Sequence, residues 1–223
     1  MSFNVAIDGP AGAGKSTIAK ELAKNLDFIY VDTGAMYRAL AYFFLLEKAD
    51  ISNEEEIKAI VEKAEVVIAY ENGKQQVYLN GENVTAHLRE EEVGNAASKT
   101  SAYGCVRAHL LKLQQDLAMT QDVIMDGRDI GTCVLPDAQL KIYLTASVKT
   151  RAKRRYDELL EKGEHPELLE IEQGIEQRDK QDMTRALSPL KQAEDAVLVD
   201  SSDMTIVQVV QTIEKLVYER RNL

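Results

Sequence analysis

A glycine-rich segment near the N-terminus limits what this chain can fold into more than any other feature. Residues 9–16 match the pattern G-x-x-x-x-G-K-[ST], in which backbone N–H groups cradle phosphate oxygens. An apolar run over residues 3–8 precedes the segment, and a run with helical periodicity over residues 15–26 follows it. A strand, this loop and a helix in that order are the context that the pattern requires. The sequence therefore predicts a phosphate-binding loop that opens an α/β fold.

Most of the remaining chain continues this alternation of strands and helices. Further β-rich runs cover residues 28–31, 122–126, 140–144 and 197–200. Helical patterns cover residues 33–44, 91–118, 147–160, 167–185 and 204–219. Thr33 is expected to cap the helix that it begins. Five β-rich runs alternating with helices predict a doubly wound, five-stranded parallel sheet with helices on both faces.

The alternation stops in the middle of the chain. Asn72-Gly73 separates β-rich runs over residues 66–70 and 76–79, and Asn-Gly between two such runs is the strongest short hairpin signal. A second Asn-Gly follows at Asn80, and Val84 closes a possible third strand. Strands joined this tightly are antiparallel. Residues 51–89 are therefore predicted to form a small antiparallel insertion on the parallel core.

Length and charge set the broad class. With 223 residues the chain is predicted to be one domain, residues 1–223. Its 27 Lys and Arg against 37 Asp and Glu give a net charge of −10, which argues against a nucleic-acid partner. A pocket for a small anion stays open, because it needs only a few cations. The sequence shows no heptad seam, so we expect a monomer.

Cysteine usage and hydropathy bear on the compartment. Cys105 and Cys133 lie far apart, without the spacing of a zinc site or a disulfide framework. Two such thiols fit a reducing cytoplasm. Asp8 interrupts the N-terminal apolar run, so no signal peptide is expected, and the longest apolar stretch, residues 39–46, is too short for a membrane span. We therefore expect a cytoplasmic protein with no membrane partner.

The chemistry of the loop assigns its first roles. Gly12 and Gly14 permit the backbone conformations that a close approach to phosphate needs. Lys15 is expected to reach the β- and γ-phosphates of a nucleotide, and the Ser16 hydroxyl to bind Mg²⁺. Asp126 ends an apolar run, where a carboxylate is well placed to hold Mg²⁺ through a water molecule.

Two sets of charged residues could serve a phosphoryl transferase. Residues 151, 154 and 155 are arginines that share one face of a predicted helix, which suits either phosphate binding or a solvated surface. Arg178, Asp182 and Arg185 form a stripe that suits either a surface salt-bridge ladder or contact with a nucleotide. The guanine-specific motifs Asp-x-x-Gly and Asn-Lys-x-Asp are both missing from the sequence, which disfavours a GTPase switch.

With these motifs in view, the chain resembles the bacterial cytidylate kinases over nearly its whole length. The resemblance rests on five segments. They are the phosphate loop, residues 32–38 (DTGAMYR), residues 95–98 (NAAS), residues 126–132 (DGRDIGT) and the stripe Arg178, Asp182 and Arg185. It implies a P-loop kinase-type fold with a helical lid over residues 147–166 and an acceptor region over residues 33–105. It also implies transfer of the γ-phosphoryl group of ATP, with Mg²⁺, to CMP or dCMP.

The resemblance also implies residue roles. ATP is expected to contact Gly9, Pro10, Ala11, Gly12, Ala13, Gly14, Lys15, Ser16, Thr17, Arg151 and Arg154. Catalytic roles fall to Lys15, Arg38, Arg128 and Arg155. CMP is expected to contact Thr33, Arg38, Ser98, Arg107, Arg128, Asp129, Arg178, Asp182 and Arg185. Guanidinium forks suit the acceptor phosphate, and the Asp129 carboxylate can accept from the 4-amino group of cytosine.

Two alternatives remain at this point. The first keeps a kinase but changes the acceptor to UMP, dTMP, AMP or a non-nucleotide hydroxyl. The second is a regulatory module that binds ATP and has no second substrate. An acceptor-dependent release of ADP separates the two, because a sensor has no acceptor site. Residues 126–132 and the arginine stripe favour a second site.

Overall fold

The computed structural model describes residues 2–221 and divides into two compact units. The first comprises the residues up to 30 and those from 121 onward, and the second comprises residues 31–120. Within the described residues, no helix is both long and apolar enough to cross a membrane.

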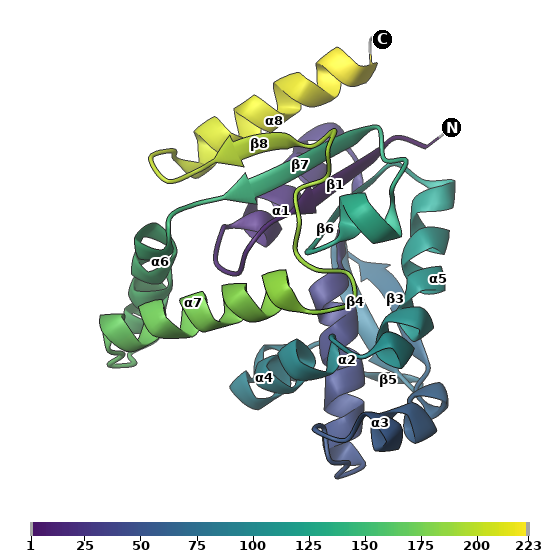
Figure 1. Cartoon of the computed structure of the whole chain (residues 1–223). Helices are drawn as coiled ribbons and strands as arrows, with labels where there is room; N and C mark the ends of the chain where they lie inside the picture. The colour runs from purple at the N-terminus through teal and green to yellow at the C-terminus, as the bar shows by residue number, and fades with distance from the viewer. Residues whose placement is uncertain (1, 222–223) are drawn as a thin grey trace. The chain divides into compact units, whose positions relative to one another are not determined.

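A five-stranded sheet forms the centre of the first unit. Its strands are β1 (Asn4–Asp8), β2 (Ile29–Asp32), β6 (Val123–Gly127), β7 (Leu140–Thr145) and β8 (Val197–Asp200). The order is β2-β6-β1-β7-β8 (Figure 1). β1 pairs in parallel with both β6 and β7, and β7 pairs in parallel with β8. The predicted doubly wound parallel sheet is confirmed, with the strand before the phosphate loop in the middle.

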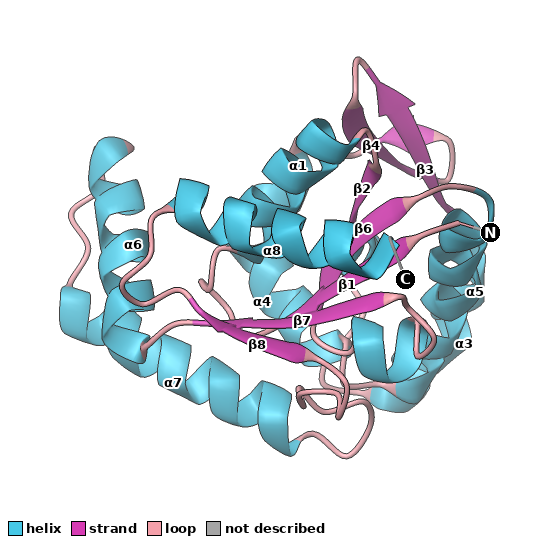
Figure 2. Ribbon diagram, turned by 90° about the horizontal axis from the view of Figure 1, so that it is seen from above, coloured by secondary structure: helices cyan, strands magenta, loops and turns pink. Residues whose placement is uncertain are grey.

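Helices α1 (Lys15–Leu26) and α8 (Ile206–Arg221) lie side by side along this sheet (Figure 2). Apolar residues of α1 recur at helical spacing, and Leu22 is fully buried against sheet residues such as Ile7 and Ile142. Ile213 of α8 joins the same cluster. Each such side chain stabilises the fold by about 1.5–3 kcal/mol through burial. The core therefore fixes the helix that begins directly after the phosphate loop.

Two further helices of this unit pack together. They are α6 (Val148–Glu161) and α7 (Leu168–Thr184), which lie side by side in both views. Ser147 caps α6, because its hydroxyl accepts a hydrogen bond from the Thr150 N–H at 3.1 Å. α7 ends one residue before Arg185, which is extended (φ −61°, ψ 142°), so the predicted charged stripe runs past the helix end. A short π-helical turn, η3 (Ile130–Val134), follows β6.

The second unit contains the predicted antiparallel insertion. Its strands are β3 (Val66–Glu71), β4 (Lys74–Leu79) and β5 (Glu82–Asn83), in that order. Asn72 and Gly73 both have positive φ, 50° and 71°, as the tight hairpin turn requires. The predicted hairpin and its short third strand are therefore confirmed.

The helices of the second unit depart from the sequence prediction in two places. They are α2 (Thr33–Leu46), α3 (Glu54–Ile60), α4 (Glu91–Thr100) and α5 (Gly104–Thr120), with 3₁₀ turns η1 (Val61–Lys63) and η2 (His87–Arg89). The helical pattern predicted over residues 91–118 is confirmed except at residues 101–103, where the chain turns and divides the segment into α4 and α5. The cap of α2 is Asp32 and not Thr33: the Asp32 carboxylate accepts from the Ala35 N–H at 2.9 Å.

Candidate active site

The phosphate loop connects β1 to α1 and ends in a left-handed glycine. Gly14 caps α1 with φ 90°, so the loop's backbone turns directly into the N-terminus of the helix. Gly9 sits against strand β7: a Cβ atom there would lie 1.9 Å from the Leu144 carbonyl oxygen. No larger residue fits at Gly9. The N–H groups at the start of α1 form the kind of anion site that phosphate oxygens occupy.

Lys15 is buried at the first turn of α1. Its Nζ donates to the Pro10 carbonyl oxygen at 2.8 Å, which folds the side chain back over its own loop. Burial, and then the positive charge of Arg128, hold the pKa of Lys15 well below its usual range, while Asp126 and Asp8 oppose that shift. The ammonium group is therefore poorly compensated, and phosphate oxygens would stabilise its charged form.

Ser16 and Asp126 meet as predicted. The Ser16 hydroxyl donates to Asp126 Oδ2 at 2.9 Å, and the Tyr30 hydroxyl donates to Asp126 Oδ1 at 2.9 Å. Asp126 is buried at the end of β6. A hydroxyl and a carboxylate oxygen beside a phosphate site are the donor set that Mg²⁺ prefers, so these residues fit the metal.

Asp8 anchors the segment that follows β6. Its buried carboxylate accepts from the backbone N–H of Ile130 at 2.8 Å and of Gly131 at 2.7 Å. Burial raises the pKa of Asp8 to about 6, although these two hydrogen bonds and Lys15 favour the ionised form. Because Asp8 directly precedes Gly9, one residue connects the phosphate loop to the segment that carries Arg128 and Asp129.

The stability of the protein should change with pH through Asp8. The unfolded carboxyl titrates near 3.8 and the folded one near 6, so the folded protein keeps the proton between about pH 4 and 6 while the unfolded chain releases it. The free energy of unfolding therefore falls as the pH rises through this window, by about 3 kcal/mol from this group. Urea unfolding of the wild type and Asp8→Asn at several pH values should show this fall only in the wild type.

A matched control comes from the exposed Asp116 of α5. Asp116→Asn should follow the wild-type stability curve through the same pH range. Wild-type and Asp8→Asn curves that run parallel from pH 4 to 7 would contradict this prediction.

Four charged side chains of the first unit form one network. The Arg128 Nε donates to Asp182 Oδ2 at 2.8 Å. Arg185 lies between two buried carboxylates, with Asp182 Oδ1 at 3.7 Å and Asp129 Oδ1 at 3.8 Å. Its Nε also donates to the Ser188 carbonyl oxygen at 2.7 Å. Arg178 lies one turn before Asp182 on α7. The structure therefore brings together predicted acceptor residues from the segment directly after β6 and from the C-terminal end of α7.

The three arginines of α6 do not share one environment, which corrects their interpretation as a single face. Arg151 is buried, and its guanidinium forms a bidentate pair with Asp179. Arg154 donates to the Ser201 carbonyl oxygen at 2.7 Å and to the Ser201 hydroxyl at 3.2 Å. Arg155 is exposed and pairs with Glu158 at 2.9 Å. Only Arg155 has the exposure of a solvated helix face.

In the second unit, Asp32 holds Arg38. The Arg38 Nη2 lies 3.1 Å from Asp32 Oδ2, and Arg89 Nη2 lies 3.2 Å from the same oxygen. Gln75 of β4 bonds the main chain of Asp32 twice: its Oε1 accepts from the Asp32 N–H at 2.8 Å and its Nε2 donates to the carbonyl oxygen at 3.2 Å. The insertion and the N-terminus of α2, where Thr33 is buried, are thus joined at one residue, Asp32, through both its main chain and its carboxylate.

Ser98 and Arg107 lie near one another in the same unit. The Ser101 hydroxyl donates to the Ser98 carbonyl oxygen at 3.1 Å, and Arg107 Nη1 donates to the Ser101 carbonyl oxygen at 3.1 Å. The Arg107 guanidinium also lies over the Tyr37 ring, 5.5 Å from its centre. The turn between α4 and α5, which the sequence prediction missed, is what brings these two residues together.

Several residues with structural roles at the site were not predicted. Asp32 received no chemical role, and Asp8 appeared only as an interruption of an apolar run. Asp179 was not predicted because the charged stripe that begins at Arg178 was followed along one face of the helix. Asp179 is the next residue in the sequence and therefore points to a different face. Tyr30 lies within the β-rich run over residues 28–31, and only its place on β2, beside β6, shows that it can reach Asp126.

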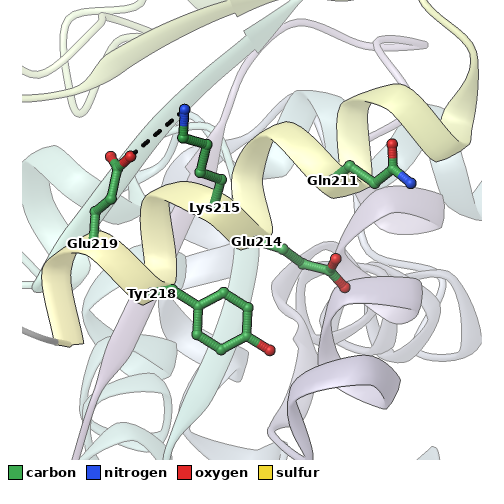
Figure 3. Close-up of a pocket in the computed structure, with 5 residues that line it drawn as sticks. All are labelled: Gln211, Glu214, Lys215, Tyr218 and Glu219. Carbon is green, nitrogen blue, oxygen red and sulfur yellow. Dashed lines mark ion pairs between the residues drawn. The ribbon is translucent and has the colours of Figure 1, made fainter.

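A separate shallow pocket follows α8 and contains none of these residues. It is lined by Gln211, Glu214, Lys215, Tyr218 and Glu219 (Figure 3). Lys215 pairs with Glu219 at 3.9 Å, and Glu214 accepts from Asn25 of α1 at 2.6 Å. All five lining residues lie on one helix, and none was predicted to bind a nucleotide.

The fold and the site together define a P-loop kinase. A glycine-rich loop follows the central strand of a parallel sheet, a lysine and a serine begin the next helix, and a carboxylate lies on the adjacent strand. The family model described as "Cytidylate kinase" matches residues 5–219. The chain belongs to the cytidylate kinase family, which confirms the predicted enzyme class, an ATP-dependent nucleoside monophosphate kinase.

Individual relatives agree with this assignment. A cytidylate kinase of Caldicellulosiruptor saccharolyticus is 50% identical over 217 residues, covering 97% of this chain and 96% of the relative. A cytidylate kinase of Lactobacillus gasseri is 47% identical over 219 residues, covering 98% and 95%. The solved structure of an uncharacterized protein from Eubacterium ventriosum is similar in fold, with a TM-score of 0.54 at 11% identity, covering 96% of this chain and 98% of that one.

Proposed function

We propose that the chain transfers the γ-phosphoryl group of ATP to CMP or dCMP, which yields ADP and CDP or dCDP. The observation that supports this most is the network of Arg128, Asp182, Arg185 and Asp129. It lies in the same unit as the phosphate loop, within a chain of the cytidylate kinase family. A module that only binds ATP has no use for such a second group of charges.

On the ATP side, the backbone of residues 9–17 binds the phosphates and Lys15 neutralises charge on the group that is transferred. Ser16 would hold Mg²⁺ directly, and Asp126 would hold it through a water molecule. Bound Mg²⁺ supplies positive charge for the phosphate oxygens during transfer. Tyr30 and Ser16 orient the Asp126 carboxylate, since each donates to one of its oxygens. Arg154 and Arg155 add positive charge from α6, within a lid over residues 147–166.

On the acceptor side, Arg38 and Arg128 bind the phosphate of CMP, and Thr33 contributes a hydroxyl. Arginine suits this role because its planar fork binds phosphate bidentately and stays charged. Residues 33–105 form the acceptor region. The base is read by Ser98, Arg107 and Asp129. The sugar is held by Arg178 and Asp182, and Arg185 lies against the nucleotide.

The reaction needs no strong general base. The acceptor is a phosphate oxygen that is already ionised at neutral pH, so the protein does not have to remove a proton from it. The chain then contributes by holding the two nucleotides in line and by neutralising charge. The buried ion pairs of the site serve this purpose, because they fix the arginines before the substrates arrive.

We further propose that the protein works as a cytoplasmic monomer without a nucleic-acid partner. The net charge of −10 supports the absence of nucleic-acid binding, because a duplex binder normally carries a basic footprint. The two isolated cysteines support a reducing compartment. Size-exclusion chromatography with light scattering tests the oligomeric state.

The test is the release of ADP from Mg-ATP with CMP, dCMP, UMP, dTMP and AMP supplied separately at equal concentration. Fast turnover confined to CMP and dCMP would support the phosphate loop, the acceptor site and the cytosine-reading residues together. Fast turnover with a different acceptor would keep the kinase and overturn the roles given to Ser98, Arg107 and Asp129. Folded protein that binds ATP but shows no acceptor-stimulated turnover would overturn the proposed function.

A further inference from the structure

A buried ion pair joins α6 to α7 in the first unit. Arg151 Nη2 lies 2.6 Å from Asp179 Oδ2, and Arg151 Nη1 lies 3.1 Å from Asp179 Oδ1. The two side chains are 4% and 12% exposed. A bidentate pair of this kind fixes the orientation of both groups, and it holds them more tightly than a single contact would.

The same guanidinium also holds the phosphate loop. Arg151 Nη1 donates to the Ala11 carbonyl oxygen at 2.9 Å, and Arg151 Nε donates to the Ala146 carbonyl oxygen at 2.9 Å. A Cβ atom on Gly12 would lie 3.3 Å from the Arg151 Cβ, so the loop's backbone rests on this side chain. The buried Arg151 side chain therefore contacts three parts of the first unit. They are the phosphate loop at Ala11, the residue directly after β7, Ala146, and helix α7 at Asp179.

Asp179 occupies an informative place on α7. It directly follows Arg178 and lies three residues before Asp182, which binds Arg128. If α7 moved away from α6, Arg151 and Asp179 would each lose a buried ionic partner, which is strongly unfavourable. If the phosphate loop moved away from α6, the Arg151 guanidinium would lose its hydrogen bond to the Ala11 carbonyl oxygen. The loop and α7 are therefore expected to move as one body when a nucleotide binds to either.

We propose that the Arg151–Asp179 pair couples the two nucleotide sites, so that a triphosphate on the phosphate loop tightens the binding of the monophosphate, and the monophosphate tightens the binding of the triphosphate. The inference rests on the proposed function, because it requires both sites. Arg151 is then a positioning residue that acts through the Ala11 carbonyl group. This replaces its predicted role as a direct ligand of ATP.

Isothermal titration calorimetry of the full chain tests this. The Kd of CMP is measured alone and with a saturating non-hydrolysable ATP analogue and Mg²⁺, and the Kd of the analogue is measured with and without CMP. In the wild type, each nucleotide should tighten the other by about fivefold or more, and by equal factors in the two directions. If the ion pair had only a structural role, its removal would lower the free energy of unfolding and leave the coupling factor, the ratio of the two Kd values of one nucleotide, unchanged.

The central variant is Arg151→Met with Asp179→Leu. Replacing a buried ion pair by apolar side chains of similar size often keeps a protein folded. Both nucleotides should still bind to this variant, while the coupling factor falls to near unity. Asp179→Asn alone keeps the charge of Arg151 and should also lose most of the coupling. The Asp179→Asn result decides the question if the double variant does not fold.

The matched control is Lys153→Gln with Asp157→Asn, which removes an exposed ion pair from the same helix. It should keep the wild-type coupling factor. Wild-type coupling in folded Asp179→Asn, or loss of coupling only when Arg151 is changed, would overturn the proposal. A wild type in which both nucleotides bind independently would also overturn it. A wild type that binds no CMP at all would instead overturn the proposed function.

Discussion

Arg128→Ala should lower kcat/KM for CMP by about 10²- to 10⁴-fold, because the loss of a group that stabilises transition-state charge costs about 10²- to 10³-fold for an oxyanion-hole donor and about 10³- to 10⁵-fold for an arginine finger. In the structure, Arg128 is oriented by Asp182 through its Nε and by the Gly127 carbonyl oxygen through its Nη1. Its side chain is 22% exposed, so the fork stays accessible to a ligand. Steady-state kinetics with CMP as the varied substrate measure the effect.

The variant needs a control for folding and one for the residue type. Asp182 is buried and loses one partner in Arg128→Ala, so the melting temperature of the variant is compared with the assay temperature. Arg220 of α8 is an exposed arginine outside the site, and Arg220→Ala should leave kcat/KM unchanged. Arg128→Lys keeps the positive charge but loses the guanidinium fork, so its kcat/KM should lie between the values of the wild type and of Arg128→Ala. Near-normal kinetics in a folded Arg128→Ala would rule out the assigned role.

Asp129→Ala should reduce the preference for CMP over UMP by about 10- to 100-fold, the value of one hydrogen bond to a charged group. Cytosine presents an amino donor where uracil presents a carbonyl acceptor, and a carboxylate can bind only the donor. Asp129 is buried and lies 3.8 Å from Arg185, which holds its charge in place. The measurement is kcat/KM for CMP and UMP in parallel, and the loss should fall mainly on CMP.

Two further observations make this result specific. Asp129→Asn retains one carbonyl oxygen as an acceptor, so it should keep part of the preference that Asp129→Ala loses. The Kd of an ATP analogue should not change in either variant, because Asp129 has no role at the phosphate loop. An unchanged CMP/UMP ratio in Asp129→Ala would show that another residue reads the base.

The fold was predictable because its signals are local. Apolar runs located each of the five core strands to within two residues, and the Asn-Gly turns located the hairpin. The two helix errors have local causes as well. Asp32 and Thr33 are both good caps, and only the structure shows which one accepts from Ala35. The break at residues 101–103 lacks a proline, so a continuous helical pattern covered it.

The site was only partly predictable. Ser16 and Asp126 were both predicted beside the phosphate loop, from the motif and from the carboxylate at a strand end, but their direct hydrogen bond depends on β6 lying next to β1, which the sequence did not indicate. The buried role of Arg151 was not predictable, because its sequence neighbours Arg154 and Arg155 carry the same charge in different surroundings. Asp8 and Asp179 were missed because each acts on residues more than 25 positions away, and no local pattern records such a contact.

The order of the strands has a consequence for biosynthesis. β1 pairs with β6 and β7, and the Phe3 N–H already bonds to Asp122, 119 residues further along the chain. During translation, the apolar β1 therefore leaves the ribosome long before either partner strand exists. At about 5–20 residues per second, it waits for several seconds at least. Residues 31–120 have their own core contacts and can fold during this interval, whereas the phosphate loop can take shape only after β6 and β7 arrive. The nascent chain is thus most exposed to aggregation during the interval before its phosphate loop has folded.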